Sequence, residues 1–199
     1  MKKIEQVFRE VLYQALEKGN MVMTQSELAK KLGFSLSTVN LAIKKIEKIG
    51  AVRIEKMNFK IIDVMKILYF WASSRNLDSD ILYSTRADVP VRDIERNMPE
   101  AFYAAYSAYK LRFKDAPADY SEVYVYADEK SLEVIKRRFP LKKSRTKANL
   151  FILKADENMR KYGKIGSIGQ IFVELWNLRE WYAHDFLNAL ENKIKEIIN

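Results

Sequence analysis

The 199-residue chain contains no cysteine and a single histidine, His184. The missing cysteines exclude disulfides, zinc sites built from thiolates and cysteine nucleophiles. One histidine supplies too few soft ligands for a zinc site of the usual kind. Among metal sites, only a magnesium ion bound by carboxylates remains possible. We expect neither a resident metal nor a cofactor.

Long apolar runs are also missing, because no stretch reaches about 18 uninterrupted apolar residues. The opening residues, MKKIEQVFREVLYQALEK, lack the apolar core and the small-residue cleavage site of a signal peptide. With 48% hydrophobic and 31% charged residues, the composition is typical of a soluble globular protein of one or two domains. We therefore expect a cytoplasmic protein that does not bind membranes.

Negative charge is scarce in two places, and the net charge of the chain is +9. Residues 1–62 carry +6 of it, and residues 63–199 carry +3. Within the later part, residues 136–147 (KRRFPLKKSRTK) hold seven basic and no acidic residues. Two basic islands on an otherwise neutral to acidic body predict a polyanionic partner.

Two helices are expected near the amino terminus. Apolar residues recur at helical spacing over residues 3–18. Thr24 is followed three residues later by Glu27, a capping box in which hydroxyl and carboxylate satisfy free backbone amides. The helix that starts there is expected over residues 25–32, because Gly33 stops it.

A third helix and a hairpin follow. The helix starts after a serine cap, at Ser35 or Ser37, and ends at Gly50. At 100° per residue its inward arc is apolar: Val39, Ala42, Ile43, Ile46 and Ile49. Residues 51–55 and 59–63 are β-prone runs joined by a compact tip, Lys56-Met57-Asn58. This order of elements is typical of a winged helix-turn-helix, which reads DNA.

The outward side of the third helix carries groups that can read base edges in the major groove, where lysine donates to guanine and asparagine pairs with adenine. The expected base-contacting residues are Ser37, Asn40, Leu41 and Lys44. Phosphate contacts, which hold register without reading sequence, are expected from Lys45, Lys48, Lys56 and Lys60. A lysine-rich face is also typical of a merely solvated surface, and winged helices also bind RNA or proteins.

Beyond residue 63 helical and strand patterns alternate. Helices are expected over residues 63–73, 90–97, 99–114, 129–139, 166–176 and 180–198, and strands over residues 81–85, 122–127 and 148–154. Residues 122–154 thus read as a β-α-β unit. We predict an α+β protein with a winged helix-turn-helix domain over residues 1–63 and a mixed α/β domain over residues 64–199.

The second domain offers little evidence of catalysis. Asp78 and Asp80 resemble the paired carboxylates of a magnesium-dependent nucleotidyltransferase, but the glycine-serine turn upstream and a third carboxylate are missing. Glycines 163, 166 and 169 lack the ending of a phosphate-binding loop. We assign no catalytic residue and expect a protein that is not an enzyme. A nucleotidyltransferase-like enzyme, or a module that binds RNA or protein, are the alternatives.

Two further groups in the second domain have both a functional and a plain structural interpretation. The basic island suggests a second contact with nucleic acid, but it is equally typical of a solvated helix end and loop; its candidates are Lys142, Lys143, Arg145 and Lys147. Aromatic residues near the carboxyl terminus could stack on bases, although their helical spacing favours the core: Trp176, Trp181, Tyr182 and Phe186.

Four later segments, read together with the winged helix, resemble the AbiEi antitoxin-like family of transcriptional regulators: EAFYAAYSAYKLRF, EVYVYADEKSLEVIKRRF, KANLFILKAD and GQIFVELWNLREWYAHDFLNALENKI. The resemblance spans most of the chain. It implies a regulator that binds double-stranded promoter repeats and represses its own operon. It also implies a functional link, without a stable complex, to a nucleotidyltransferase-like toxin of a type IV toxin-antitoxin pair. A palindromic operator would require a homodimer, but no heptad pattern marks a dimer face.

Overall fold

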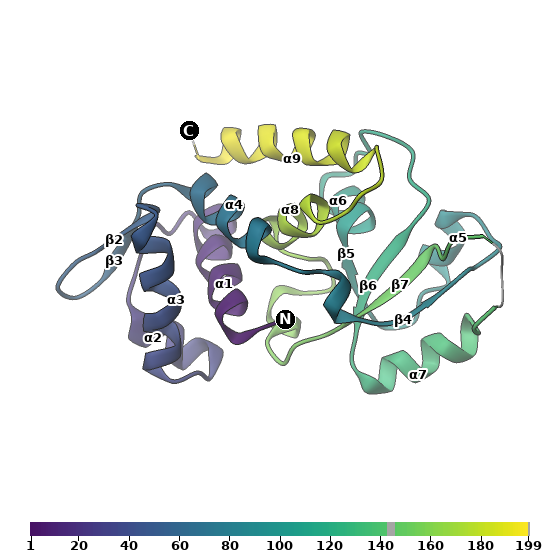
Figure 1. The fold of residues 1–199 in the computed structure, drawn as a ribbon, viewed down its shortest axis with the longest axis horizontal. Coiled ribbons are helices and arrows are strands. Elements are labelled where there is room, and N and C mark those ends of the chain that lie inside the picture. The colour runs from purple at the N-terminus through teal and green to yellow at the C-terminus, as the bar shows by residue number, and fades with distance from the viewer. Residues whose placement is uncertain (143–145, 199) are drawn as a thin grey trace. The chain divides into compact units, whose positions relative to one another are not determined.

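The computed structural model describes residues 1–142 and 146–198, and the chain forms two compact units (Figure 1). The first unit comprises Met1–Arg75, Ser167–Val173 and Glu191–Asn199. The second comprises Asn76–Gly166 and Glu174–Leu190. The first unit therefore reaches beyond residue 63, and it takes in two segments from late in the chain. The domain bounds at residue 63 stay a prediction.

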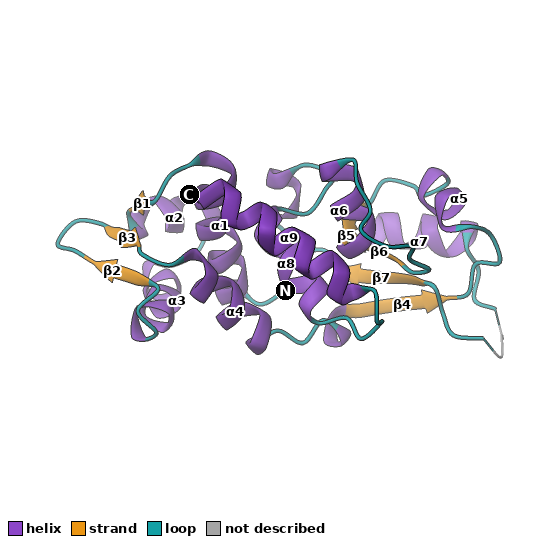
Figure 2. Cartoon of the chain, turned by 90° about the horizontal axis from the view of Figure 1, so that it is seen from above, coloured by secondary structure: helices purple, strands orange, loops and turns teal. Residues whose placement is uncertain are grey.

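The first unit contains all the predicted parts of the winged helix-turn-helix (Figures 1 and 2). Its continuous part is α1 (Lys3–Lys18), β1 (Val22–Met23), α2 (Gln25–Leu32), α3 (Leu36–Lys48), β2 (Val52–Ile54), β3 (Phe59–Ile61) and α4 (Val64–Ser74). The strands form an antiparallel sheet in the order β1-β3-β2. The sequence did not predict β1, because two residues are too few to show an alternating pattern.

Side-chain caps define the ends of the helices in this unit. The backbone N–H of Glu27 donates to Thr24 Oγ1 at 3.1 Å, and the N–H of Thr24 donates to Glu27 Oε2 at 3.1 Å, which confirms the capping box. Ser35, the first of the two serine candidates, caps α3 by accepting from the N–H of Thr38 at 3.3 Å. These local bonds fix where α2 and α3 begin.

The predicted inward arc of α3 forms the core of the unit. Four of its members are fully buried: Val39, Ala42, Ile43 and Ile46. They pack against α1 and α2. The fifth, Ile49, is only half-buried, because it lies at the end of the helix as its C-cap.

Two late helices contribute to the first unit: α8 (Ile168–Trp176) and α9 (Ala183–Ile198). Gly169 packs directly on α1, since a Cβ built there would lie 2.9 Å from Cβ of Leu12. The N–H of Ile168 donates to Glu17 Oε1 of α1 at 2.8 Å. In α9, Glu191 accepts a hydrogen bond from Tyr69 of α4. These contacts join late residues to early ones.

The second unit is built on a mixed four-stranded sheet. In chain order its elements are η1 (Asp78–Asp80), β4 (Ile81–Thr85), α5 (Val91–Arg96), β5 (Phe102–Ala104), α6 (Ala105–Phe113), β6 (Val123–Ala127), α7 (Glu129–Arg138), β7 (Leu150–Lys154) and η2 (Met159–Tyr162). The strand order is β4-β7-β6-β5. Strands β6 and β7 are parallel and joined through α7, which confirms the predicted β-α-β unit.

The helix predicted over residues 99–114 is wrong in its first half. Phe102–Ala104 forms β5 and pairs with β6, and the helix begins only at Ala105, which has φ +46°. The run FYAAYSAY is compatible with both a helix and a strand. Its first residues form a strand because they can form backbone hydrogen bonds with the edge of β6.

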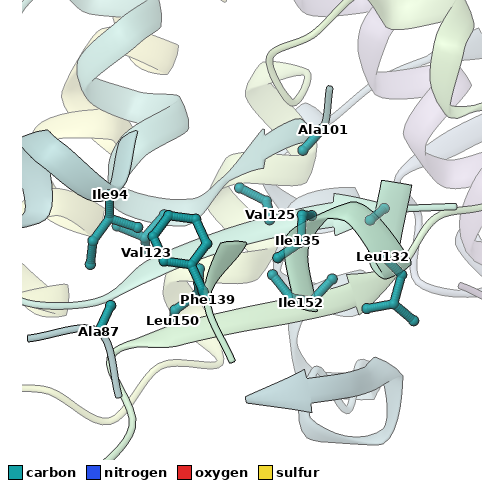
Figure 3. Close-up of a cluster of buried hydrophobic side chains, with 11 residues drawn as sticks. Ala87, Ile94, Ala101, Val123, Val125, Leu132, Ile135, Phe139, Leu150 and Ile152 are labelled. Atoms are coloured by element: carbon teal, nitrogen blue, oxygen red, sulfur yellow. The ribbon is translucent and has the colours of Figure 1, made fainter. Parts of the chain in front are cut away.

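The two faces of the sheet have different cores. On one face, Val123, Val125 and Ile152 pack against the apolar residues of α5 and α7 (Figure 3). On the other, the buried ring of Tyr106 lies 5.2 Å from Tyr182 and 5.0 Å from Phe186, between ring centroids. Burial raises the pKa of the Tyr106 hydroxyl well above its ordinary value.

Only half of the aromatic residues near the carboxyl terminus lie in the core. Tyr182 and Phe186 are buried, as predicted, but Trp176 is 43% and Trp181 76% exposed. The core interpretation is therefore wrong for the two tryptophans. No helix in the described part of the chain is both long and apolar enough to span a membrane.

Candidate nucleic-acid interface

The outward surface of α3 carries the predicted base-contacting residues. Ser37 and Lys44 are exposed, and Leu41 is 52% exposed although it is apolar. Asn40 is half-buried at the side of this surface. The burial of the opposite arc fixes the rotation of the helix, so these side chains face away from the core. The geometry is that of a helix free to enter a groove.

Asn40 is held in place by α2. Its Nδ2 donates to Oε1 of Gln25, the first residue of α2, at 3.0 Å. One of the two amide hydrogens is used in this bond, so the second hydrogen and Oδ1 can still form a bidentate pair with adenine. The sequence reasoning missed Gln25, and only its position at the start of the helix before the turn could have indicated it.

Ser37 is less free than predicted. Its hydroxyl lies 3.0 Å from Ser35 Oγ, the oxygen that caps α3. A base contact from Ser37 would share this hydroxyl with the cap.

The predicted phosphate-contacting lysines are exposed cations on the helix and the wing: Lys45, Lys48, Lys56 and Lys60. Among residues 1–142 and 146–198, neither these four nor Lys44 forms an ion pair. Elsewhere in the same unit, Lys31 is paired with Glu10 at 2.7 Å. Between residues 35 and 62 the only acidic residues are Glu47 and Glu55, against six basic ones. This surface therefore has uncompensated positive charge, which is suited to a polyanion.

The wing adds a cation that the sequence reasoning missed. Arg53 of β2 lies directly opposite Lys60 of β3 in the antiparallel register, and both are exposed. Like charges directly opposite on one face of a sheet repel and are destabilising. The alternation of β2, buried Val52 then exposed Arg53, was the signal that could have indicated this residue. A phosphate between the two cations would relieve their repulsion.

The second basic patch is described only in part. Lys142 and Lys147 are exposed in the second unit, and Lys142 Nζ pairs with Asp88 Oδ2 at 2.9 Å. Lys143 and Arg145 lie outside the described residues. Nearby, Arg138 Nη1 donates to the carbonyl of Asn97 at 2.7 Å. Lys142 and Arg138 thus have local partners, in contrast to the lysines of α3.

The carboxylates considered for catalysis, Asp78 and Asp80, both lie in η1. Asp78 is exposed and pairs with Arg179 at 3.4 Å. Within the described residues, no group of three or more histidine, cysteine, aspartate or glutamate side chains is arranged to hold a metal. His184 is exposed beside Trp176 and Trp181.

Comparison with known proteins agrees with this geometry for the first unit. Residues 12–53 match the family described as winged helix-turn-helix DNA-binding. The match covers α2, α3 and their turn, together with the end of α1 and the start of the wing. A comparison with curated proteins and one with solved structures each found no match. The chain thus contains a winged helix-turn-helix DNA-binding domain at residues 12–53.

Proposed function

We propose that this protein is a transcriptional regulator, and not an enzyme, that binds duplex DNA with α3 in the major groove and the wing on the flanking backbone. The observation that carries the proposal is the row of lysines on α3 and the wing that have no ion-pair partner in the described residues. Such cations release counterions from DNA when they meet phosphates, and this release drives binding.

We further propose that the regulator acts as a repressor of its own operon. A protein bound over promoter repeats blocks transcription by occupying them, and the resemblance to the AbiEi antitoxin-like family implies this arrangement. The same resemblance supports a role as the antitoxin of a nucleotidyltransferase-like toxin. A homodimer on the operator would follow if the operator is palindromic.

Fluorescence anisotropy with a labelled duplex from the region upstream of the gene tests DNA binding. The variant Lys44→Ala/Lys48→Ala should bind at least about tenfold more weakly than the wild type at physiological salt. Lys154→Ala is the matched control, since it removes an exposed cation from the second unit. Equal affinity of the double variant and the wild type would show that α3 does not bind DNA.

The alternative of an RNA-binding module is tested in the same assay. An RNA reader of the usual kind prefers unpaired bases that can be splayed out. Unlabelled single-stranded RNA and unlabelled duplex DNA are each used to displace the labelled duplex. If the RNA displaces it at a lower concentration than the duplex DNA does, the result favours that alternative. A reporter fused to the upstream region then tests repression, which the double variant should relieve.

A further inference from the structure

The second unit contains a cavity of about 500 Å³, and all of its lining residues belong to that unit. It lies among the loop before α5, the end of α5 and the end of α7. Its volume falls within the range of about 300–1,000 Å³ typical of small-molecule sites. The cavity is therefore large enough for a ligand the size of a nucleotide.

Three cations from two separate stretches of the chain line this cavity: Arg86, and Arg138 with Lys142 from the basic island of residues 136–147. Asp88 is the one acidic residue among the lining residues. Gathering three positive charges around one carboxylate leaves an excess of two, which favours an anionic ligand. A phosphate monoester carries about −1.5 to −2 charges at neutral pH and matches this excess.

The present partners of these cations leave donors for a ligand. Lys142 pairs with Asp88, but the side chains are 51% and 61% exposed, so the pair is of the weak, exchangeable kind. Arg86 Nε is buried and lies 3.5 Å from Asp88 Oδ1. Within residues 1–142 and 146–198 this nitrogen makes no hydrogen bond. Arg138 uses one of its five N–H donors on the carbonyl of Asn97.

The cavity also has an apolar wall. Phe139 belongs to the buried hydrophobic cluster between α7 and the sheet, beside Ile94 and Ala87 (Figure 3), and it lines the cavity. Val89, 47% exposed, lines it as well. Cations beside an apolar wall suit a ligand with a phosphate at one end and a flat, weakly polar ring at the other.

We propose that this cavity binds a small phosphorylated ligand of the nucleoside monophosphate class. Arg86, Arg138 and Lys142 hold the phosphate, and the base lies against Phe139 and Val89. This ligand site is separate from the DNA-binding surface proposed for the first unit, and no residue of α3 contributes to it.

Isothermal titration of the full chain tests the site, with adenosine monophosphate, inorganic phosphate and adenosine as probes. Adenosine monophosphate should bind saturably, inorganic phosphate more weakly, and uncharged adenosine not measurably. Arg86→Gln and Lys142→Gln should each weaken binding of the monophosphate by about tenfold, the value of one charge-assisted contact. Because Arg138 also supports the carbonyl of Asn97, Arg138→Lys is its variant, and circular dichroism verifies folding.

The control is Lys130→Gln, which removes an exposed cation from the other end of α7 and should leave binding unchanged. Absence of saturable binding up to about 10 mM ligand, or equal binding by the wild type and both glutamine variants, would overturn the proposal. A DNA duplex carries the same phosphate chemistry, so duplex is titrated against bound monophosphate in the Lys44→Ala/Lys48→Ala variant. Displacement by duplex there would reject a small-molecule site, and persistence of the monophosphate would support it.

Discussion

Asn40 of the recognition helix and Gln25 of the preceding helix are joined by a side-chain hydrogen bond of 3.0 Å. The bond crosses the helix-turn-helix and orients an amide that would otherwise rotate freely in solution. A base-reading side chain that is already oriented loses less conformational entropy on binding. We propose that Gln25 acts on base reading through Asn40 and needs no contact with a base.

Gln25→Leu should therefore relax the preference for adenine at the position that Asn40 reads. We expect a loss of discrimination of about 1–3 kcal/mol, the value of one bidentate base contact. The measurement is competition between the operator and a duplex with guanine at that position. Gln25→Glu retains an acceptor for Asn40 and should retain most of the preference. If Gln25→Leu discriminates as well as the wild type, the bond has no role in base reading.

Lys48→Ala should reduce the salt dependence of DNA binding while leaving base preference unchanged. Each lost phosphate contact lowers the slope of log affinity against log salt concentration by about 1. Binding isotherms at four salt concentrations measure the slope. Lys44→Ala, at a base-contacting position, should weaken binding and alter preference. An identical slope for Lys48→Ala and the wild type would remove Lys48 from the phosphate contacts.

Arg53→Thr should stabilise the free protein and weaken DNA binding. The substitution removes the repulsion between Arg53 and Lys60, which are paired in register, and threonine favours strands. We expect a gain of about 0.2–1 kcal/mol in the free energy of unfolding. Urea denaturation gives the stability, and anisotropy gives the affinity. Unchanged DNA affinity would show that the wing does not meet phosphates at this position.

Gly169→Ala should destabilise the protein, although alanine is the better helix former. Propensity alone would favour alanine by about 1 kcal/mol. The new Cβ would lie 2.9 Å from Cβ of Leu12, so one helix must shift, and overpacking of this kind costs about 1–3 kcal/mol. Thermal unfolding measures the result. A higher melting temperature for the variant would show that α1 and α8 are not in close contact.

Asp128 should make the free energy of unfolding of the second unit depend on pH. It caps α7 by accepting from the N–H of Ser131, and this bond holds the pKa of its carboxyl below the ordinary value. Because the folded pKa is lowered, the stabilisation is present above about pH 4, the unfolded pKa. It is lost as the pH falls through the folded pKa.

Asp128→Ala should cost about 0.5–2 kcal/mol near neutral pH. Asparagine also caps helices but does not titrate, so Asp128→Asn should be nearly as stable as the wild type at neutral pH and less sensitive to acid. Denaturant titrations from pH 2.5 to 7 compare the three proteins. A wild type and an Asp128→Asn variant that lose stability in parallel would contradict the assignment.

The sequence predicted the winged helix well because its signals are local. The capping box at Thr24, the glycine stop at Gly33 and the apolar arc from Val39 each act within a turn or two of the chain. It could not predict contacts that depend on distant segments. Strand β5 exists because Phe102–Ala104 pairs with β6, and Gln25 matters because Asn40 lies across the turn from it.

The candidate DNA-binding surface could be predicted from the helical spacing of residues, whereas the cavity of the second unit could not. Arg86 lies far in the sequence from Arg138 and Lys142, and no spacing rule connects it to them. The nucleic-acid role of the second basic island stays a prediction, and two of its candidates, Lys143 and Arg145, lie outside the described residues.

The composition of the first unit has a consequence for the newly made protein. Gly169 packs on Leu12, and Glu191 accepts a hydrogen bond from Tyr69, so residues made later complete a unit whose other parts are made earlier. A chain still on the ribosome can form α1 to α4 but leaves the surface under α8 and α9 uncovered. The first unit therefore reaches its full stability only after translation has passed Glu191, and we expect DNA binding at full strength only from that point.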